Sequence, residues 1–582
     1  MIEHITQEFL NLIKMPDKAG KHLNYLLVMP RIVTRKDMTY QLPYGFCMVT
    51  AALKASGRSV FTLNLNYKEN IDILLEQMIQ EYSIDVVATG GLSGQFSLLK
   101  EITDAAKRIK PDIITMVGGG IITAEPITAL EALETADYGM IGEGEITINA
   151  LAYALEHDND PCEVAGVVVK NRDYPGNEYL RRPEIANLDV LPFPDYDGFE
   201  YYMLTQSNMF SAAGVQAKTA IVTTGRSCPF NCTFCFHSSG KRYRKRSVKN
   251  VLKEIDWIMD RYDIQYIMFV DELFASDAQY LKELTAQIKN RNIKYWVQTR
   301  VDMVSKETLE LLRDSGCYEI TFGVESADDR ILKSMQKRIT VAQIEHAFDL
   351  AQEVGLPAKG YIIFGDLEET EDTINTSLVW WNRHPDYNIR LWWILTFPGS
   401  YLYQVACERG MIPDHVKYLR ENNTQLNLSK MSDTVYWNMV NQVELYQILV
   451  SAGVQLNFDK VRPVAEELGR ALENLLNNHK IAVWPATLDN ISMLSYISPK
   501  FASHEDVVFV NVNPQDSYVL GANLGEKKVY TPDTAFERCD FDLVLYAFGH
   551  RDAGKVYEQI CGMAQKSYPS VKQIIKLSEL LN

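Results

Sequence analysis

The chain has 582 residues, of which 47% are hydrophobic and 23% are charged, and its formal net charge is -17. At about 150 residues per domain, this length predicts about three or four domains, and the composition is that of an ordinary folded protein. The acidic charge argues against a general binder of nucleic acid or anionic membranes, because such proteins need a basic surface that displaces counterions.

The N-terminal residues 1–21 mix acidic and apolar side chains and lack the pattern of a secretory signal. No apolar run approaches the roughly 20 residues that span a bilayer, so we expect no transmembrane segment. Six of the nine cysteines are scattered without a pairing rhythm: Cys47, Cys162, Cys317, Cys407, Cys539 and Cys561. This usage fits a reducing compartment, and we expect a cytoplasmic protein.

The first part of the chain alternates buried-strand runs with helices. After a helical extension at residues 1–23, strand runs begin near residues 24, 59, 84, 112 and 136, and a helix is expected from about Tyr44 to Ser56. Several strand runs end in glycines just before a helix, as in "VGGG" and "IGEGE". This order predicts a doubly wound, Rossmann-like parallel sheet over residues 24–162, whose ligands bind at the carboxyl ends of the strands.

The middle of the chain repeats the strand-helix unit. Residues 163–216 are rich in turns and are interpreted as a connector. Over residues 217–403, strands and helices recur after a loop that contains cysteines, which predicts a partial (β/α)6 barrel whose function gathers at the strand ends. The polar residues at these ends are Asp271, Glu272, Gln298, Arg300, Glu325, Ser326 and Asp366.

The last part of the chain has two sections, a helical region at residues 404–478 and a small Rossmann-like α/β domain at residues 479–582. The first strand of this domain runs into Trp484 and Pro485, where a nucleotide-binding turn would need glycines, and "VNVNP" stands in place of a second strand. Without the glycines a pyrophosphate could not approach the backbone, so we expect a structural or partner-docking role.

Three cysteines lie within eight residues, Cys228, Cys232 and Cys235, in the pattern CxxxCxxC. A structural zinc site needs four ligands, and no second pair with suitable spacing follows, although His237 is a possible fourth ligand. Three thiolates can instead hold an iron-sulfur cluster and leave one iron open to an external ligand. Incidental core cysteines are a further alternative, although they lack such regular spacing.

The cysteine pattern, with Phe234 before its last cysteine and an apolar strand ahead of it, resembles that of the radical S-adenosylmethionine (SAM) enzymes. The resemblance extends from Ala217 to about Tyr403, through "MFVDELF", "QTRVDMV", "GVES" and "GYIIFGDLEET". It implies that the three cysteines hold a [4Fe-4S] cluster, that the open iron binds SAM, and that an electron from the cluster cleaves SAM to a 5'-deoxyadenosyl radical. Such a radical needs a pocket that excludes water.

The same resemblance implies a set of SAM contacts. Phe234 would touch the adenine, Glu325 would hold polar groups of SAM, and Arg300 is a candidate for the SAM carboxylate or for substrate. At residues 270–272, "VDE" departs from the glycine-rich edge that many family members present to the SAM amine. The alternative is that each of these residues stands at a strand end and forms its hydrogen bonds with a neighbouring loop. The expected SAM-binding residues are Phe234, Asp271, Glu272, Gln298, Arg300, Glu325 and Ser326.

The first segment is similar to the cobalamin-binding domain found before radical SAM barrels, through "QLPYGFCMVTAALKASG", "GGLSGQ", "VGGGIITAEP" and "YGMIGEGE". Glycines at these strand ends let the backbone approach a flat corrin ring and its nucleotide tail. The expected cobalamin contacts are Gln41, Tyr44, Gly91, Leu92, Ser93, Gln95, Gly118, Gly119, Gly120, Glu143 and Gly144. A flavodoxin-like module without cobalamin is the alternative, since a fold does not fix its ligand.

No Asp-x-His-x-x-Gly motif is present, and the histidines before the connector, His4, His22 and His157, lie in other contexts. We therefore expect cobalamin without a protein histidine ligand to cobalt, with residues 92–95 facing its lower side.

The strongest local basic run of the chain is "KRYRKR", Lys241 to Arg246. It could grip an anionic substrate or an electron-donor protein, but a solvated charge run before a helix is the favoured interpretation.

Three modules in this order look like the cobalamin-dependent radical SAM enzymes. The resemblance implies methylation of an unactivated carbon of a small molecule or natural product, through methylcobalamin and the 5'-deoxyadenosyl radical. One alternative is a radical rearrangement, cyclisation or ring contraction in which cobalamin transfers electrons, and another is a catalytically silent cobalamin or redox sensor. The expected partners are a small-molecule substrate and an electron donor such as flavodoxin or ferredoxin, with no nucleic acid.

Overall fold

The computed structural model describes residues 4–32, 40–206, 218–274, 277–422, 424–486, 488–510, 529–530, 535, 541–547, 557–558, 560–564, 568 and 570–581. The chain divides into two compact units. The first unit contains residues 1–323, 342–358 and 396–424, and the second contains residues 324–341, 359–395 and 425–582.

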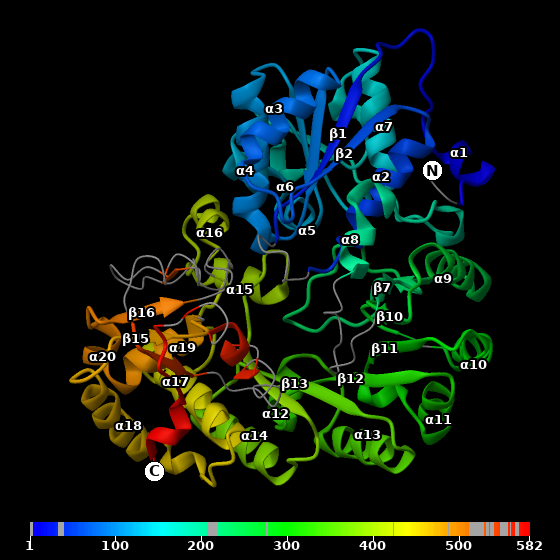
Figure 1. Cartoon of the computed structure of the whole chain (residues 1–582). Helices are drawn as coiled ribbons and strands as arrows, with labels where there is room; N and C mark the ends of the chain where they lie inside the picture. The colour runs from blue at the N-terminus through cyan, green and yellow to red at the C-terminus, as the bar shows by residue number, and fades with distance from the viewer. Residues whose placement is uncertain are drawn as a thin grey trace. The chain divides into compact units, whose positions relative to one another are not determined.

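The first unit begins with a six-stranded sheet (Figure 1). Its strands are β1 (Asn24–Met29), β2 (Ser59–Asn64), β3 (Val86–Gly90), β4 (Ile114–Gly118), β5 (Tyr138–Met140) and β6 (Val167–Val169). The order is β2-β1-β3-β4-β5-β6, with β1 to β5 parallel and β6 antiparallel to β5. The predicted doubly wound parallel sheet is confirmed, and β6 adds a strand from the start of the expected connector.

Helices cover both faces of this sheet, which explains its nearly continuous apolar strands. They are α2 (Tyr44–Ala55), α3 (Ile71–Glu81), α4 (Phe96–Ile109), α5 (Gly120–Ala124), α6 (Pro126–Leu133) and α7 (Gly144–Glu156). Leu26 of β1 packs in one cluster with Leu75 of α3 and Ile102 of α4, while α2 and α7 lie on the other side (Figure 1). A short helix, α1 (Gln7–Leu12), places Phe9 against α2.

A second sheet has the strand order β14-β13-β12-β11-β10-β7. Its strands are β7 (Thr219–Val222), β10 (Tyr266–Phe269), β11 (Lys294–Thr299), β12 (Cys317–Glu325), β13 (Ala358–Phe364) and β14 (Ile389–Trp393). The ladders from β7 through β10 and β11 to β12 are parallel, as is the pair β13 and β14. Because β7 and β14 are the edge strands, the sheet is open: the six predicted strands are present, but they form no closed barrel.

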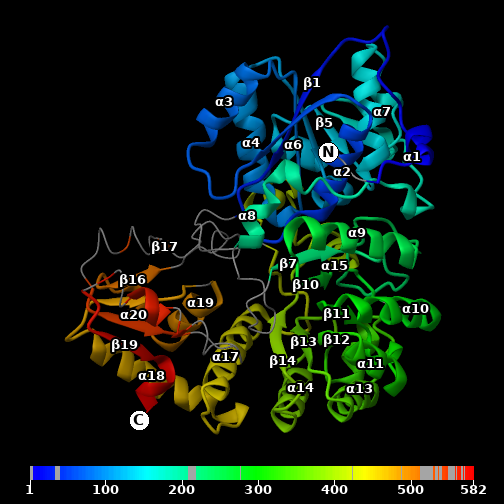
Figure 2. The ribbon, with the colours of Figure 1, turned by 45° about the vertical axis from the view of Figure 1, so that its right-hand side comes forward.

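Helices accompany the strands of the first unit's part of this sheet: α9 (Val248–Tyr262), α10 (Ala278–Ile288) and α11 (Lys306–Asp314). Figure 2 shows all three on one side of β7, β10 and β11. At the start of each helix, the side chain of the N-cap residue accepts a hydrogen bond from a backbone N–H of the first turn; these residues are Ser247, Asp277 and Ser305 respectively. The helices α15 (Tyr401–Glu408) and α16 (His415–Glu421) belong to the first unit as well.

The second unit contains the helices α14 (Glu371–Arg383), α17 (Asp433–Ser451), α18 (Val461–Leu475), α19 (Leu488–Ile497) and α20 (Pro499–Ser503). It also contains a parallel sheet in the order β17-β16-β15-β18-β19, which is the small α/β fold expected at the end of the chain. These strands are β15 (Ile481–Val483), β16 (Val507–Val510), β17 (Val529–Tyr530), β18 (Leu543–Tyr546) and β19 (Gln573–Lys576). Residues 511–514 of the expected "VNVNP" strand lie outside the described residues.

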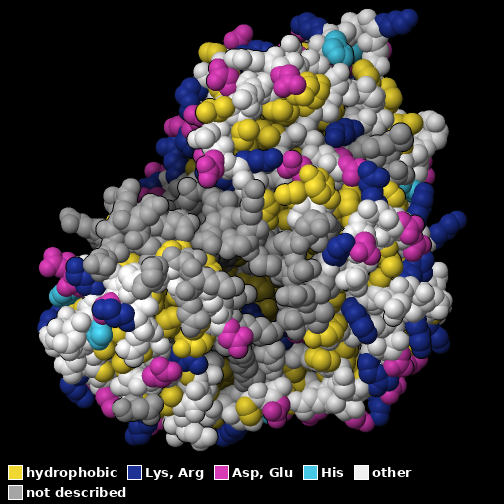
Figure 3. All heavy atoms as spheres, viewed as in Figure 1, with side chains coloured by type: hydrophobic (Ala, Val, Ile, Leu, Met, Phe, Trp, Pro, Cys, Tyr) yellow, Lys and Arg dark blue, Asp and Glu magenta, His cyan; other side chains and the backbone are white. Residues whose placement is uncertain are grey.

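Trp484, at the end of β15, is buried in the core of the C-terminal sheet and contacts Tyr568. None of the helices that the structure describes has the length and apolar character needed to span a membrane. On the face shown in Figure 3, the Lys and Arg side chains are interspersed with Asp and Glu.

Candidate active site

The three cysteines lie on one loop of the first unit. The loop connects β8 (Gly225–Arg226) to β9 (Arg244–Lys245), two short strands that pair antiparallel. Cys232 is buried, Cys228 is half-buried and Cys235 is exposed, and none of the three forms a disulfide with a described cysteine. The Cys235 N–H donates to the Cys232 carbonyl at 3.1 Å, which closes a turn. Burial raises the pKa of the Cys228 thiol, so a bound metal would be needed to hold it as a thiolate.

The geometry of the loop does not favour a zinc site. Among the described residues, no group of three or more His, Cys, Asp or Glu side chains is arranged to hold a single metal ion. Both ring nitrogens of His237 have partners, with Nδ1 2.7 Å from Glu272 Oε2 and Nε2 3.1 Å from the Phe230 carbonyl oxygen. The three thiols of an iron-sulfur cluster bind three different irons, so they need not converge on one point. The three thiols therefore fit a cluster better than a zinc ion.

The first unit contains a cavity of about 590 Å³, within the size range of cofactor sites. One wall consists of Thr89 and Gly90 of β3 and Gly118 of β4, at the carboxyl ends of the strands. Another wall comes from the cysteine loop and its flanks, through Ser227 and Ser238. The cavity thus lies where a doubly wound sheet binds its ligands, and the cysteine-bearing loop forms part of it.

Ten of the eleven expected cobalamin contacts line this cavity: Gln41, Tyr44, Gly91, Leu92, Gln95, Gly118, Gly119, Gly120, Glu143 and Gly144. Ser93 does not; it begins a short 3-10 helix between β3 and α4. Gln95 Oε1 accepts a hydrogen bond from the Leu92 N–H at 3.0 Å, and the Leu92 side chain is exposed. Leu92 and Gln95 therefore line the cavity, and their place at the lower side of cobalamin stays a prediction.

Glycines keep this cavity open and its walls close together. Gly119 has φ +91°, and a Cβ there would lie 2.5 Å from the Gly91 carbonyl oxygen, so only glycine fits. A Cβ on Gly45 or Gly142, which also line the cavity, would have no atom within 4 Å. The space beside these two glycines suits a flat ring that approaches the backbone. These residues therefore fit a corrin.

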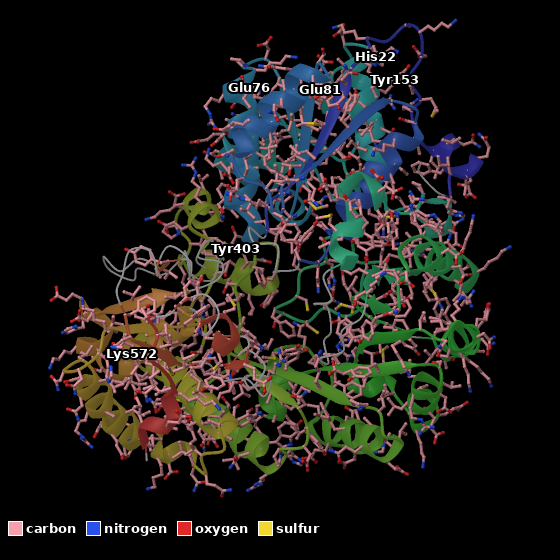
Figure 4. All side chains as sticks on the ribbon, viewed as in Figure 1. His22, Glu76, Glu81, Tyr153, Tyr403 and Lys572 are labelled. Carbon is pink, nitrogen blue, oxygen red and sulfur yellow. The ribbon has the colours of Figure 1, made fainter. Side chains whose placement is uncertain are left out.

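None of the described residues that line this cavity is a histidine. His22 lies just before β1 and its Nε2 is 3.1 Å from the hydroxyl of Ser59, the first residue of β2. It therefore lies at the amino-terminal edge of the sheet, opposite the strand ends that line the cavity (Figure 4). Cobalamin without a protein histidine ligand to cobalt stays a prediction.

Glu143, an expected cobalamin contact, is bound by two arginines at the cavity wall. Arg226 Nη1 donates to its Oε1 at 2.7 Å, and Arg244 Nη1 donates to its Oε2 at 2.7 Å. Burial raises the pKa of the Glu143 carboxyl, but these guanidinium groups outweigh burial and hold that pKa below its ordinary value. Glu143 is thus charged, and its carboxylate is committed to protein partners.

The basic run at 241–246 is only partly solvated. Arg244 and Arg246 are buried. Arg246 pairs with the buried Glu254 at 2.6 Å, and Tyr44 donates its hydroxyl to the same carboxylate at 3.1 Å. The interpretation of a solvated charge run is therefore wrong for these two arginines, because Glu143 binds Arg244 and Glu254 binds Arg246.

The strand-end residues of the first unit mostly bind their own protein. Asp271, at the end of β10, accepts from the backbone N–H groups of Thr224 and Gly225 at 2.9 and 2.6 Å, and burial raises its pKa to about 6. Gln298 Nε2 donates to the Asp271 carbonyl at 2.9 Å. All three residues of the "VDE" stretch line the cavity, and among the expected SAM-binding residues Asp271 and Glu272 alone do so.

Arg300 lies against the cysteine loop, and Phe234 is part of that loop. The Arg300 guanidinium carbon is 3.7 Å from the centre of the Phe230 ring, and its nitrogens donate to both carboxylate oxygens of Asp302 at 2.9 Å. Phe230 lies between Cys228 and Cys232, so Arg300 lies over the loop. Phe234 is half-buried.

In the second unit, the "GVES" residues have internal partners. Glu325 has φ +66° and accepts from Lys337 at 2.7 Å, with both residues buried. Ser326 Oγ accepts from the Asp328 N–H at 3.2 Å. Asp366, after β13, is fully buried, and its Oδ2 has no hydrogen-bond partner among the described residues. The SAM contacts expected from these residues stay predictions.

Several lining residues were not singled out from the sequence: Gly45, Gly142, Ser238 and Ser239. The two serines follow the last cysteine by three and four residues, so their position after the triad was an available signal. Gly45 is the second residue of α2, where a helix gains nothing from glycine. A glycine at such a position indicates that something approaches the backbone.

Two family models match the chain in regions that contain these features. The Radical SAM superfamily matches residues 222–380, and the B12 binding domain matches residues 30–152. The chain thus contains a radical SAM module and a B12-binding module, and these matches, with the relatives below, support a cobalamin-dependent radical SAM, methyltransferase-like family whose cofactors are a [4Fe-4S] cluster, SAM and cobalamin.

Curated relatives are similar to this chain over more than half of its length. An uncharacterized methyltransferase of Pyrococcus horikoshii is 28% identical over 343 residues, which cover 58% of this chain and 72% of that protein. A cytidylyl-2-hydroxyethylphosphonate methyltransferase of Streptomyces wedmorensis is 25% identical over 407 residues, 60% of this chain and 75% of that protein. An anaerobic magnesium-protoporphyrin IX monomethyl ester cyclase of Cereibacter sphaeroides is 27% identical over 357 residues, 59% of this chain and 56% of that protein.

Solved structures show the same fold. The radical SAM methyltransferase TsrM of Kitasatospora setae, with cobalamin and a [4Fe-4S] cluster bound, has a TM-score of 0.55 at 20% identity, covering 67% of this chain and 78% of that chain. The cobalamin-dependent SAM radical enzyme OxsB, with aqua-cobalamin and SAM bound, has a TM-score of 0.60 at 17% identity, covering 82% and 75%.

Proposed function

We propose that the protein methylates an unactivated carbon of a small-molecule or natural-product substrate. One observation carries this proposal: a single cavity is lined both by the glycine-rich strand ends of the cobalamin module and by the loop that holds Cys228, Cys232 and Cys235. Chemistry that uses both cofactors on one substrate needs them at one space, because positioning supplies a large part of the rate. Two of the relatives described above are methyltransferases by name.

When bound, the cluster and SAM supply a hydrogen-abstracting radical, and cobalamin supplies the methyl group. The chain's residues bind and orient these groups. Cys228, Cys232 and Cys235 would hold the cluster, and Gly91 and Gly119 let the backbone approach the corrin. Leu92 would place an apolar side chain at its lower side, so no strong protein ligand would hold the metal there.

Further parts of this proposal concern modules and partners. We assign the cobalamin module to residues 24–162, the connector to 163–216, the SAM module to 217–403, and the helical and α/β regions to 404–478 and 479–582. An electron donor such as flavodoxin or ferredoxin would reduce the cluster. None of the eight cysteines in the described part of the chain forms a disulfide with another described cysteine, which supports work in the reducing cytoplasm.

Product analysis of the reconstituted enzyme tests the function. The protein is reconstituted anaerobically with iron and sulfide, given hydroxocobalamin, reductant and SAM, and supplied with candidate substrates. Methylation predicts S-adenosylhomocysteine and 5'-deoxyadenosine in equal amounts, together with a substrate heavier by one methyl group. Production of 5'-deoxyadenosine without S-adenosylhomocysteine would overturn methylation.

A second candidate is a radical cyclisation or rearrangement without methyl transfer. The observation that favours it is the similarity to the magnesium-protoporphyrin IX monomethyl ester cyclase of Cereibacter sphaeroides. The same product analysis separates the two candidates, because cyclisation yields no S-adenosylhomocysteine. A catalytically silent sensor would yield neither product.

A further inference from the structure

Arg226 ends the strand β8, two residues before Cys228, and contacts two acids of the cobalamin module. Its Nη1 donates to Glu143 Oε1 at 2.7 Å and its Nη2 donates to Glu145 Oε1 at 2.5 Å. Glu143 caps the start of α7, and Glu145 is the second residue of that helix. The guanidinium group thus spans two carboxylates that lie just after the glycine-rich end of β5.

The other end of the cysteine loop reaches the same acid. Arg244, on β9, donates to Glu143 Oε2 at 2.7 Å and also to the Ser239 carbonyl within the loop at 2.8 Å. Because β8 and β9 pair with each other, Arg226 and Arg244 are cross-strand partners. Both stems of the loop that carries the cysteines are therefore bound to the N-terminus of α7.

This network is buried and its charges are paired. The exposed fractions of the side chains are 14% for Arg226, 6% for Glu143, 3% for Glu145 and 2% for Arg244. Glu184 is a further acid, 3.6 Å from Arg244, so both guanidinium groups are committed to carboxylates of the protein. A buried guanidinium group that bridges two carboxylates fixes geometry, because the planar group accepts few orientations.

We propose that Arg226, with Glu143 and Glu145, positions the cysteine loop against the cobalamin module and thereby sets the distance between the cluster and the cobalt. These are positioning residues: they act through the loop that holds the cysteines and through the strand ends that hold cobalamin. The inference rests on the two cofactors of the proposed function, but it concerns their spacing rather than the fate of the methyl group.

The test compares three variants of the full-length reconstituted enzyme. Arg226→Lys keeps the charge but cannot bridge both acids, Arg226→Gln removes the charge, and Glu145→Gln removes one acceptor. The matched control is Arg108→Lys, which alters an exposed ion pair with Asp72 on the same module. The main readout is the magnetic interaction between Co(II) cobalamin and the reduced cluster, measured by pulsed electron paramagnetic resonance without substrate or turnover.

We expect a shifted or broadened distribution of distances between cobalt and cluster in all three variants, and the wild-type distribution in the control. In turnover, the ratio of 5'-deoxyadenosine to methylated product should rise by about tenfold to 100-fold, because small misplacements of reacting groups are that costly. Total SAM cleavage should stay within about twofold of the wild type. If Arg226→Gln does not fold, the distance distributions of Arg226→Lys and Glu145→Gln still test the inference.

A wild-type distance distribution in Arg226→Lys and Glu145→Gln would overturn the inference. Loss of cluster and cobalamin binding together, with no change in spacing among the loaded molecules, would also overturn it and assign the network a purely structural role. Failure of the proposed methylation would appear differently, as a wild-type enzyme without a methylated product. The distance measurement would remain informative in that case.

Discussion

Gly45 allows the most direct test of the cavity, because one substitution should have opposite effects on stability and on cobalamin binding. It is the second residue of α2, and a Cβ there would have no atom within 4 Å. In Gly45→Ala, the helix gains about 1 kcal/mol from the better helix former, so the protein without cobalamin should be at least as stable as the wild type. The added methyl group, however, stands where the corrin is expected.

The size of the binding defect follows from crowding at a packed contact. Adding a methyl group to a filled site costs about 1–3 kcal/mol, which corresponds to a Kd about 5- to 150-fold weaker. The assays are titration of the protein with hydroxocobalamin, followed by absorbance, and thermal melting without cobalamin.

The matched control is Gly562→Ala, in a helical stretch of the second unit where a Cβ also has no atom within 4 Å. This control should leave the Kd for cobalamin unchanged. Tight cobalamin binding in Gly45→Ala, equal to that of the wild type and of the control, would refute the assignment of this cavity to the corrin.

Three further predictions follow from the described residues. Replacing Cys228, Cys232 and Cys235 together by alanine should abolish iron binding, measured by iron analysis, and retained iron would contradict the cluster assignment. Gly119→Ala should be less stable than the wild type by at least about 1–2 kcal/mol, because the backbone at this position is left-handed. The variant should also fail to retain cobalamin, which is measured by absorbance. Burial raises the pKa of Glu369 to about 8 from 4.5, so its native carboxyl keeps a proton that the unfolded chain releases. Stability should therefore fall as pH rises from about 4.5 to about 8, and chemical denaturation of Glu369→Gln should show a weaker decline.

Much of the fold could be predicted because parallel sheets covered on both faces produce long apolar runs. Residues 25–29 of β1 are fully buried, and such a run marks a central strand without further information. β6 has only three residues, and its pairing with β5 depends on a partner nearly thirty residues away. Short edge strands of this kind carry too little local pattern to be distinguished from a turn.

The cobalamin residues could be predicted better than the partners of the SAM residues, and the reason is physical. Glycines at strand ends are needed by the backbone itself, so their position in the sequence already locates the site. Charged strand-end residues, in contrast, are satisfied by whichever groups the tertiary fold brings near. Asp271 binds the backbone of residues 224 and 225, and Glu325 binds Lys337, and neither partner could be read from the motif.

The basic run at 241–246 carries a sequence signal for such internal partners. Side chains alternate along a strand, so Arg244 and Arg246 share a face while Lys245 points away and pairs with the half-exposed Asp277. Two arginines two residues apart, in a chain with net charge -17, have many acids available as internal partners. Their burial is favourable only with paired acids, and those acids are Glu143 for Arg244 and Glu254 for Arg246. A basic cluster in an acidic protein is therefore better tested first for internal acidic partners and only then as a binding surface.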